Sequence, residues 1–201
     1  MGRYLVTGGA GFIGSNLVDA LIEQGHEVVV WDNLSTGKRD NVHKDADFRY
    51  VDVSTMLDVY NVGAANIRQE YDTIFHLAGE ARIQPSFESP ELYHRSNVTG
   101  TSNILEFARK FDTPVVYAGS SSVYHDVYAN PYTFTKSKAE EYCWLYQRTY
   151  KLPVAIARFF NVYGPRHLHE GPYATVVGIF EKQKMDDVPL TVTGKIGRAH
   201  V

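Results

Sequence analysis

The sequence predicts an α/β fold, a parallel and doubly wound sheet with helices on both faces. Short apolar strands alternate with helical stretches from the N-terminus to about residue 160, which is the pattern of such sheets. Glycine, serine or acidic residues follow most of the predicted strands, where a parallel sheet binds its ligands. The chain has 201 residues, of which 44% are hydrophobic and 21% charged, so we expect one globular domain or one domain plus a fragment.

The first predicted strand, Tyr4–Val6, runs directly into a glycine-rich turn and then a helix. Gly8, Gly11 and Gly14 recur at every third position, a spacing that differs from the commoner Gly-x-Gly-x-x-Gly. Gly8 and Gly11 allow the backbone to approach a pyrophosphate, and Gly14 allows the helix to pack close to the strand. The helix N-terminus attracts phosphate. Taken alone, a glycine cluster also occurs in strand–helix turns that bind no ligand.

The second predicted strand, Val28–Trp31, is a continuous apolar run, which is typical of a strand covered on both faces. It ends at Asp32, eighteen residues after Gly14. A carboxylate at this place accepts hydrogen bonds from the adenosine ribose and repels a 2′-phosphate. Because the next residue is Asn33 rather than Arg, the sequence favours NAD over NADP. The alternative is that Asp32 is a solvated turn residue.

The other predicted elements continue the alternation. Strands are expected at Phe48–Asp52, Thr73–Leu77, Val115–Ala118, Val154–Ala157 and Pro189–Thr193, and helices from Asp52 to about Tyr71, at Pro90–Phe111 and at Pro131–Tyr150. Ligands bind beyond the carboxyl ends of the strands in such sheets. We therefore expect Asp32, Asp52, Ala78–Gly79 and Gly119–Ser120 to border one crevice together with the glycine turn.

Tyr132 and Lys136 lie four residues apart, so a phenol and an ammonium share one face of a predicted helix. The preceding strand brings Gly119–Ser122 to the same edge of the sheet. A lysine cation close to a tyrosine favours the phenolate, which makes Tyr132 a candidate general base for an alcohol or sugar hydroxyl. In isolation the spacing is more often an ordinary helix face with a solvated lysine. The N-terminal motif and the serine-bearing strand end favour catalysis.

Charge and composition argue against several classes of partner. The formal net charge is −3 without any run of five like charges, so neither a nucleic-acid surface nor a polybasic membrane surface is expected. No apolar run reaches the length of a membrane span. The early glycine motif leaves no room for a signal peptide, and the single cysteine, Cys143, fits a reducing compartment, so a cytoplasmic protein is expected.

We expect no metal site. His167, His169 and Glu170 form the only run that suggests metal ligands, and no partner cluster is apparent elsewhere in the sequence. A polar loop after Pro165 is the simpler interpretation.

Further motifs follow in order: Asp32–Gly37, Asp52–Val53, His76–Gly79, Ser96–Thr101, Ser120–Tyr124 and Arg158–Pro165. Together with Thr7–Gly14 and the pair of Tyr132 and Lys136, they resemble the extended short-chain dehydrogenase/reductase family, specifically its NAD-dependent nucleotide-sugar epimerases and dehydratases. The similarity covers nearly all of the chain from Arg3 to about Thr193, and Asp32–Gly37 is especially similar to UDP-glucose 4-epimerases. It implies a Rossmann-type domain at residues 1–165 that binds NAD and carries the catalytic residues.

The resemblance also implies roles for individual residues. Lys136 would bond the nicotinamide ribose and activate Tyr132 as the base, and Ser120 would hydrogen-bond the reacting oxygen. These three are the expected catalytic residues, and Ser120, Tyr132 and Asn161 the expected substrate contacts. The expected NAD-binding residues are Gly8, Gly11, Phe12, Ile13, Gly14, Asp32, Asn33, Leu34, Ser35, Thr36, Gly37, Asp52, Val53, Leu77, Ala78, Gly79, Glu80, Ala81, Asn97, Tyr132, Lys136 and Phe160.

The implied reaction is the epimerisation of a nucleotide sugar, with a UDP-hexose as the expected substrate. Tyr132 takes the proton of the sugar's 4-hydroxyl while a hydride leaves the same carbon for NAD⁺, and the resulting ketone receives the hydride on its other face. Related dehydratases place an acid pair just after the catalytic Ser/Thr, where this chain has Ser121 and Ser122, which favours epimerisation. Another redox-neutral reaction, such as dehydration or decarboxylation, and NAD binding without turnover are the alternatives. A homodimer through Pro90–Phe111 and Pro131–Tyr150 is also implied.

The chain departs from the family pattern in two places. His125 stands where the family usually has Gly, and only seven residues separate Tyr124 from Tyr132. The sequence therefore does not identify the sugar or the nucleotide of the substrate. Relatives continue with a smaller substrate-binding domain, which we expect to be largely missing here, with residues 166–195 as its start. Residues 196–201 match one reading frame of a common sequencing adapter, and we interpret them as a non-native tail.

Overall fold

A computed structural model describes residues 1–55, 59, 71–171 and 174–191 of the chain. The chain divides into two compact units, Met1–Val162 and Tyr163–Val201. The first unit holds a sheet and the helices that cover it. The described residues of the second unit include a loop and the helix α7 (Val176–Met185). We describe each unit by itself.

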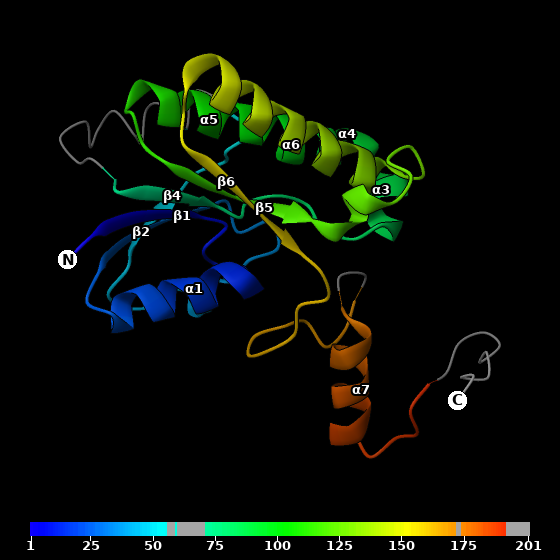
Figure 1. Cartoon of the computed structure of the whole chain (residues 1–201). Helices are drawn as coiled ribbons and strands as arrows, with labels where there is room; N and C mark the ends of the chain where they lie inside the picture. The colour runs from blue at the N-terminus through cyan, green and yellow to red at the C-terminus, as the bar shows by residue number, and fades with distance from the viewer. Residues whose placement is uncertain (56–58, 60–70, 172–173, 192–201) are drawn as a thin grey trace, which may run out of the picture. The chain divides into compact units, whose positions relative to one another are not determined.

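Among the described residues, six parallel strands form one sheet with the order β3-β2-β1-β4-β5-β6 (Figure 1). The strands are β1 (Arg3–Thr7), β2 (Glu27–Asp32), β3 (Asp47–Tyr50), β4 (Thr73–His76), β5 (Val115–Ser120) and β6 (Val154–Phe159). Thr7, the last residue of β1, pairs with Trp31 on one side and with His76 on the other. The strand order reverses direction between β1 and β4, and the crevice at such a point is where doubly wound sheets bind ligands.

Helices cover both faces of this sheet. Helix α1 (Phe12–Glu23) lies on one face, and α5 (Gly100–Lys110) and α6 (Pro131–Tyr150) lie on the other (Figure 1). Before α5, the chain forms α3 (Gln84–Glu88), α4 (Pro90–Tyr93) and the π-helical segment η2 (His94–Thr99), and short 3₁₀ turns occur at η1 (Arg39–Asn41) and η3 (Ser121–Tyr124). The predicted fold class is therefore confirmed.

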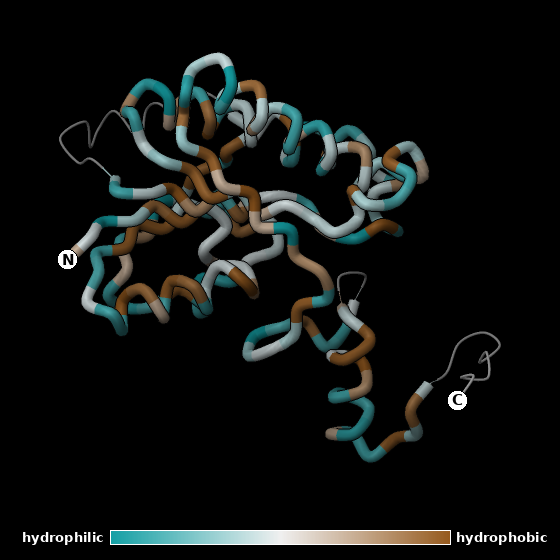
Figure 2. The backbone as a smooth tube through the Cα atoms, in the orientation of Figure 1, coloured by the Kyte–Doolittle hydropathy of each residue, from teal (hydrophilic) through white to brown (hydrophobic). Residues whose placement is uncertain are grey.

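Alternating residues of the strands fill two separate cores. Leu5 belongs to the core beneath α5 and α6, whereas its neighbour Val6 belongs to the core beneath α1. Val29 and Val30 divide in the same way, because successive side chains of a strand point to opposite faces. Figure 2 shows hydrophobic backbone segments concentrated along the strands. Cys143 is fully buried in the larger core, so it is a packed thiol, as its helical context predicts.

The predicted elements match the observed ones within about two residues at each end, with three exceptions. The expected helix Pro90–Phe111 is helical, but η2 interrupts its α-helical hydrogen bonding. The strand expected at Pro189–Thr193 is wrong for residues 189–191, which are not in a strand, and its last two residues lie outside the described ones. The helix expected between Asp52 and Tyr71 falls mostly outside the described residues. None of the described helices has both the length and the apolar character that a membrane span requires.

Candidate functional site

The glycine turn after β1 leaves the N-terminus of α1 open to an anion. Gly8 has a φ of +73°, and a Cβ there would lie 2.7 Å from the backbone nitrogen of Ala78. A Cβ on Gly14 would lie 2.2 Å from the carbonyl oxygen of Gly8, so α1 starts directly against the turn. Gly11 is the N-cap of α1, and within the described structure its first turn carries neither a side-chain cap nor an acidic residue. The uncapped N–H groups and the helix dipole therefore fit a phosphate.

The carboxylate of Asp32, at the end of β2, is tied to the same turn. Its Oδ2 accepts a hydrogen bond from the backbone N–H of Ala10 at 3.0 Å, and its Oδ1 accepts one from Leu34 at 2.7 Å. Burial raises the pKa of Asp32, although these two hydrogen bonds oppose the shift. Each oxygen keeps a second lone pair that a ribose hydroxyl can use. Gly37 packs on the turn, since a Cβ there would lie 2.9 Å from the carbonyl carbon of Ala10.

Asp52, just beyond β3, is held beside the loop that follows β2. Its Oδ1 accepts hydrogen bonds from the backbone N–H and the hydroxyl of Ser54 at 2.9 and 2.7 Å. Burial alone would raise the pKa of Asp52, but the hydrogen bonds from Ser54 and from the side chain of Asn33 outweigh it and lower the pKa. Val53 is fixed from the other side, because its carbonyl accepts a hydrogen bond from Asn103 at 2.9 Å.

The segment after β4 is fixed by the buried side chain of Asn97. Its Oδ1 accepts a hydrogen bond from the backbone N–H of Glu80 at 2.8 Å, and its Nδ2 donates to the Glu80 carbonyl at 3.2 Å. A Cβ on Gly79 would lie 2.6 Å from the same Oδ1, so a larger residue there would displace the Asn97 amide. Asn97 belongs to the π-helical segment η2, and such local widenings of a helix are frequent at functional sites.

Ser120, Tyr132 and Lys136 meet where β5 ends and α6 begins. The hydroxyl of Tyr132 donates to Oγ of Ser120 at 3.1 Å. Nζ of Lys136 donates to the carbonyl of Ala118 at 2.7 Å, which leaves two of its three protons for another acceptor. Burial lowers the pKa of Lys136 to about 8. The start of α6 is itself well defined, since the side chain of Asn130 accepts a hydrogen bond from Thr133 at 2.8 Å.

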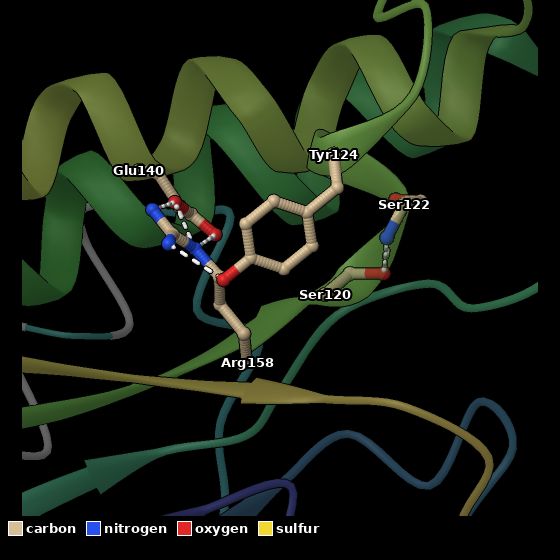
Figure 3. Close-up of polar contacts among 5 residues, drawn as sticks. All are labelled: Ser120, Ser122, Tyr124, Glu140 and Arg158. Carbon is tan, nitrogen blue, oxygen red and sulfur yellow. Dashed lines mark hydrogen bonds and ion pairs between the residues drawn. The ribbon is translucent and has the colours of Figure 1, made fainter.

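Next to this group lies an ion pair that the sequence did not indicate (Figure 3). Arg158 on β6 forms hydrogen bonds with both carboxylate oxygens of the buried Glu140, at 2.8 to 3.2 Å, and donates to the hydroxyl of Tyr124 at 3.1 Å. A Cβ on Gly119 would lie 2.8 Å from Oε1 of Glu140. The pair thus packs directly against the strand end that carries Ser120. Tyr132, Lys136 and Glu140 recur every four residues, and this spacing was the available signal.

A second group is the buried imidazole of His76, a residue of the motif His76–Gly79 to which the sequence assigned no role. Its Nδ1 lies 2.7 Å from Oγ1 of Thr7, and its Nε2 lies 3.1 Å from Oγ1 of Thr101. Because Thr101 donates to the carbonyl of Asn97 at 2.6 Å, the partners assign the proton of His76 to Nε2. Burial, assisted by the charge of Lys136, lowers the pKa of His76 to about 3, so the ring is neutral near pH 7. This chain of hydrogen bonds joins the glycine turn to η2.

The short connection before Tyr132 borders a hollow of about 440 Å³. Its described lining residues are Phe87, Pro90, His94, Tyr128, Ala129, Asn130, Pro131, Phe134 and Thr135. Neither Ser120 nor Lys136 appears among them. The hollow is therefore not the place where the three candidate catalytic side chains meet.

The sequence matches the NAD dependent epimerase/dehydratase family over residues 4–198. The chain belongs to this family. Membership confirms the expected cofactor, NAD, and it agrees with the resemblance drawn from the motifs.

Relatives in the NAD dependent epimerase/dehydratase family include different enzymes. The UDP-glucose 4-epimerase of Mycolicibacterium smegmatis is 34% identical, over 90% of this chain and 62% of its own length. UDP-glucuronic acid decarboxylase 1 of Xenopus tropicalis is also 34% identical, over 96% of this chain and 48% of its own length. The structure of a UDP-glucose 4-epimerase with UDP-glucose from Thermotoga maritima is 30% identical with a TM-score of 0.89, covering 96% of this chain and 66% of that one. The chain spans about half to two thirds of these relatives, and they differ in activity.

Most of the predicted NAD-binding residues of this family member fall into one connected region, and Phe160 is not among them. The glycine turn and the segments after β2, β3 and β4 contact each other through Ala10, Asn33 and Asn97. Phe160 and its neighbour Asn161, which is a predicted substrate contact, follow β6 and are exposed. Among the described contacts, Phe160 stacks on the ring of Tyr124 at 6.2 Å between centroids, and none joins it to Tyr132. The binding roles of all these residues stay predictions.

Replacing Asp32 with alanine is expected to weaken NAD binding by about 10- to 100-fold, because hydrogen bonds to a charged acceptor contribute about 1.5–3 kcal/mol. Loss of the carboxylate also removes the repulsion of a 2′-phosphate, so the ratio of the NADP affinity to the NAD affinity should rise. Titration of both dinucleotides measures this ratio. Asp40→Ala, which removes an exposed carboxylate of η1, is the matched control, and an unchanged ratio in Asp32→Ala would contradict the ribose assignment.

Proposed function

We propose that this chain comes from an NAD-dependent nucleotide-sugar 4-epimerase that acts on a UDP-hexose. The observation that carries the proposal is the hydrogen bond of 3.1 Å from Tyr132 to Ser120, beside Lys136, at the carboxyl end of β5. A phenol in contact with a second hydroxyl, and near an ammonium group, fits a proton transfer to and from a sugar hydroxyl. Membership in the NAD dependent epimerase/dehydratase family supplies the matching redox cofactor.

The residues that would hold NAD are the glycine turn, Asp32 to Gly37, Asp52 with Val53, the segment from Leu77 to Ala81, and Asn97. The uncapped N-terminus of α1 fits the pyrophosphate, and the buried carboxylate of Asp32 fits the adenosine ribose. Lys136 keeps two protons for the nicotinamide ribose. When bound, NAD⁺ accepts a hydride from C4 of the sugar and later returns it.

The side chains of this chain would transfer the proton and hydrogen-bond the reacting oxygen. Tyr132, as the phenolate, accepts the proton of the 4-hydroxyl as the hydride leaves C4, so that a 4-ketone and a neutral tyrosine result. Ser120 donates a hydrogen bond to the reacting oxygen, and Lys136 stabilises the phenolate by its charge. Rotation of the ketone presents its other face, and Tyr132 returns the proton as the hydride returns to C4. Atoms and charge therefore balance without a net oxidation.

Epimerisation is favoured over dehydration by Ser121 and Ser122, which follow the catalytic serine position. Neither hydroxyl supplies the acid chemistry that loss of water requires, and in the structure Ser122 interacts with Ser120, with 2.9 Å between the two Oγ atoms. Decarboxylation is the second candidate, because UDP-glucuronic acid decarboxylases are among the relatives. A chain that binds NAD without turnover is the third, because the chain spans only part of its relatives' length.

The same proposal includes the domain boundaries, the oligomeric state and the location of the protein. We place the NAD-binding and catalytic domain at residues 1–165, the start of a substrate-binding region at 166–195 and a non-native tail at 196–201. A homodimer through the helices of Pro90–Phe111 and Pro131–Tyr150 and a cytoplasmic location belong to the proposal as well.

The decisive experiment assays this chain and the full coding sequence of its gene with UDP-glucose and UDP-galactose. We expect the full-length protein to interconvert the two sugars at C4 without net formation of NADH. UDP-glucuronate serves as the comparison substrate, because release of carbon dioxide would identify a decarboxylase. Failure of the full-length protein to interconvert any UDP-hexose would refute the epimerase proposal. NAD binding by this chain without turnover would assign it to the third candidate.

A further inference from the structure

The second unit brings together three side chains of the types that bind transition metals. His167 and His169 lie two residues apart on the loop that precedes α7, and Glu181 lies on α7 (orange in Figure 1). Nε2 of His167 is 2.9 Å from Oε2 of Glu181, and Nδ1 of His169 is 3.7 Å from the same oxygen. One ligand atom from each residue lies within 4.8 Å of the other two.

The distances between these ligand atoms are close to those between two ligand atoms of one bound metal ion. Zn²⁺ takes nitrogen and oxygen ligands at about 2.0–2.2 Å in a tetrahedral arrangement, so two of its ligand atoms lie about 3.4 Å apart. The two distances from Glu181, 2.9 and 3.7 Å, lie on either side of that value. The side chain of His169, which is 42% exposed, has room to adjust to the geometry of an ion.

The surrounding backbone holds the ligands in place. His167 is buried, and its Nδ1 contacts the carbonyl oxygen of Gly164, which directs Nε2 toward Glu181. A backbone carbonyl on the second ring nitrogen is the usual support of a metal-binding histidine. The loop also lies tightly against α7, because a Cβ on Gly178 would be 2.3 Å from the carbonyl oxygen of Leu168. The two segments that supply the ligands are thus fixed against each other.

We propose that His167, His169 and Glu181 bind one divalent transition-metal ion, with Zn²⁺ as the best fit, and that the ion joins the loop to α7. Two imidazoles and one carboxylate match zinc and its neighbours, whereas Mg²⁺ and Ca²⁺ prefer oxygen ligands alone. Three protein ligands leave a fourth position for water. The competing interpretation is a metal-free ion pair between His167 and Glu181, in which Nδ1 of His169 instead donates to the carbonyl oxygen of Gly178, 3.3 Å away.

The test is a zinc titration of the tag-free chain after treatment with a chelator, followed by calorimetry, and a parallel titration with Co²⁺ followed by its visible absorption. We expect one equivalent of Zn²⁺ to bind and Co²⁺ to show the intense bands of a tetrahedral site. His169→Ala and Glu181→Gln should each weaken zinc binding by at least about 10-fold. Both side chains are half-exposed, so these variants should fold even where His167→Ala does not.

Two histidines of the first unit provide matched controls. His94 and His125 are both exposed and lie outside the unit that holds the cluster. His94→Ala and His125→Ala should bind zinc as the parent chain does. Zinc binding that is unaffected by both His169→Ala and Glu181→Gln, or that falls short of one equivalent in the parent chain, would overturn the proposal and leave the ion pair.

Discussion

Replacing Tyr132 with phenylalanine is expected to lower the turnover number for a UDP-hexose by about 10³-fold, within the range that a positioned acid–base group contributes. The variant loses only the phenolic oxygen, which accepts and returns the proton of the 4-hydroxyl. The same oxygen donates to Ser120 in the structure, and loss of one such bond lowers the free energy of unfolding by about 1 kcal/mol. Turnover should therefore collapse while folding and NAD affinity stay close to those of the parent protein.

The measurement compares steady-state turnover, NAD binding and urea unfolding in the same preparations of the full-length protein. Tyr150→Phe is the matched control, because Tyr150 lies at the other end of α6 and is 51% exposed. It should turn over substrate at the parent rate. Equal turnover in Tyr132→Phe and the parent protein would show that another group is the base. A parallel loss of NAD affinity would show that Tyr132 holds the cofactor rather than the proton.

Most of the fold could be predicted because its information is local. The apolar run of Val28–Trp31, the glycines after the first strand and Pro131 at the start of α6 each fix one element from a few neighbouring residues. The strand expected at Pro189–Thr193 was wrong in its described part for a physical reason. A strand needs a partner strand, and the β-forming residues there have none among the described elements.

The candidate site was predictable where its residues belong to one motif and unpredictable where they meet only in space. Ser120, Tyr132 and Lys136 were expected to meet, and the structure joins Tyr132 directly to Ser120. Glu140 and Arg158 are far apart in the sequence, and only the pairing of β5 with β6 beneath α6 brings them together. The spacing of Glu140 from Lys136 places its carboxylate on the same helix face, but nothing in the sequence identifies Arg158 as its partner.

The same limitation applies to the two groups around the histidines. His76 and Thr101 contact each other because β4 lies beside α5, and neither residue type alone indicates a buried network. No metal site was expected at His167 and His169, because no partner ligands are apparent in the sequence. Glu181 is identified as a candidate ligand only from the structure, because α7, which was not predicted, places its carboxylate next to both rings.

Replacing Gly14 with alanine is expected to lower the free energy of unfolding by about 3 kcal/mol and the NAD affinity by at least about 10-fold. The new Cβ would lie 2.2 Å from the carbonyl oxygen of Gly8, 2.8 Å from its carbonyl carbon and 2.9 Å from Cα of Gly9. All three atoms are backbone, so no rotamer change relieves the overlap, and α1 must move away from the turn. Its N-terminal N–H groups then no longer point at the pyrophosphate.

Gly25→Ala separates this steric effect from the general cost of replacing a glycine. Gly25 has a φ of +81°, but a Cβ there would meet no described atom within 4 Å, so its substitution costs only the strain of a left-handed backbone, about 1 kcal/mol. Urea unfolding and NAD titration of both variants give the comparison. If Gly14→Ala unfolded and bound NAD as Gly25→Ala does, the close approach of α1 to the turn would not be what shapes the phosphate site. A larger loss in Gly14→Ala on both measures is the result that the backbone contacts require.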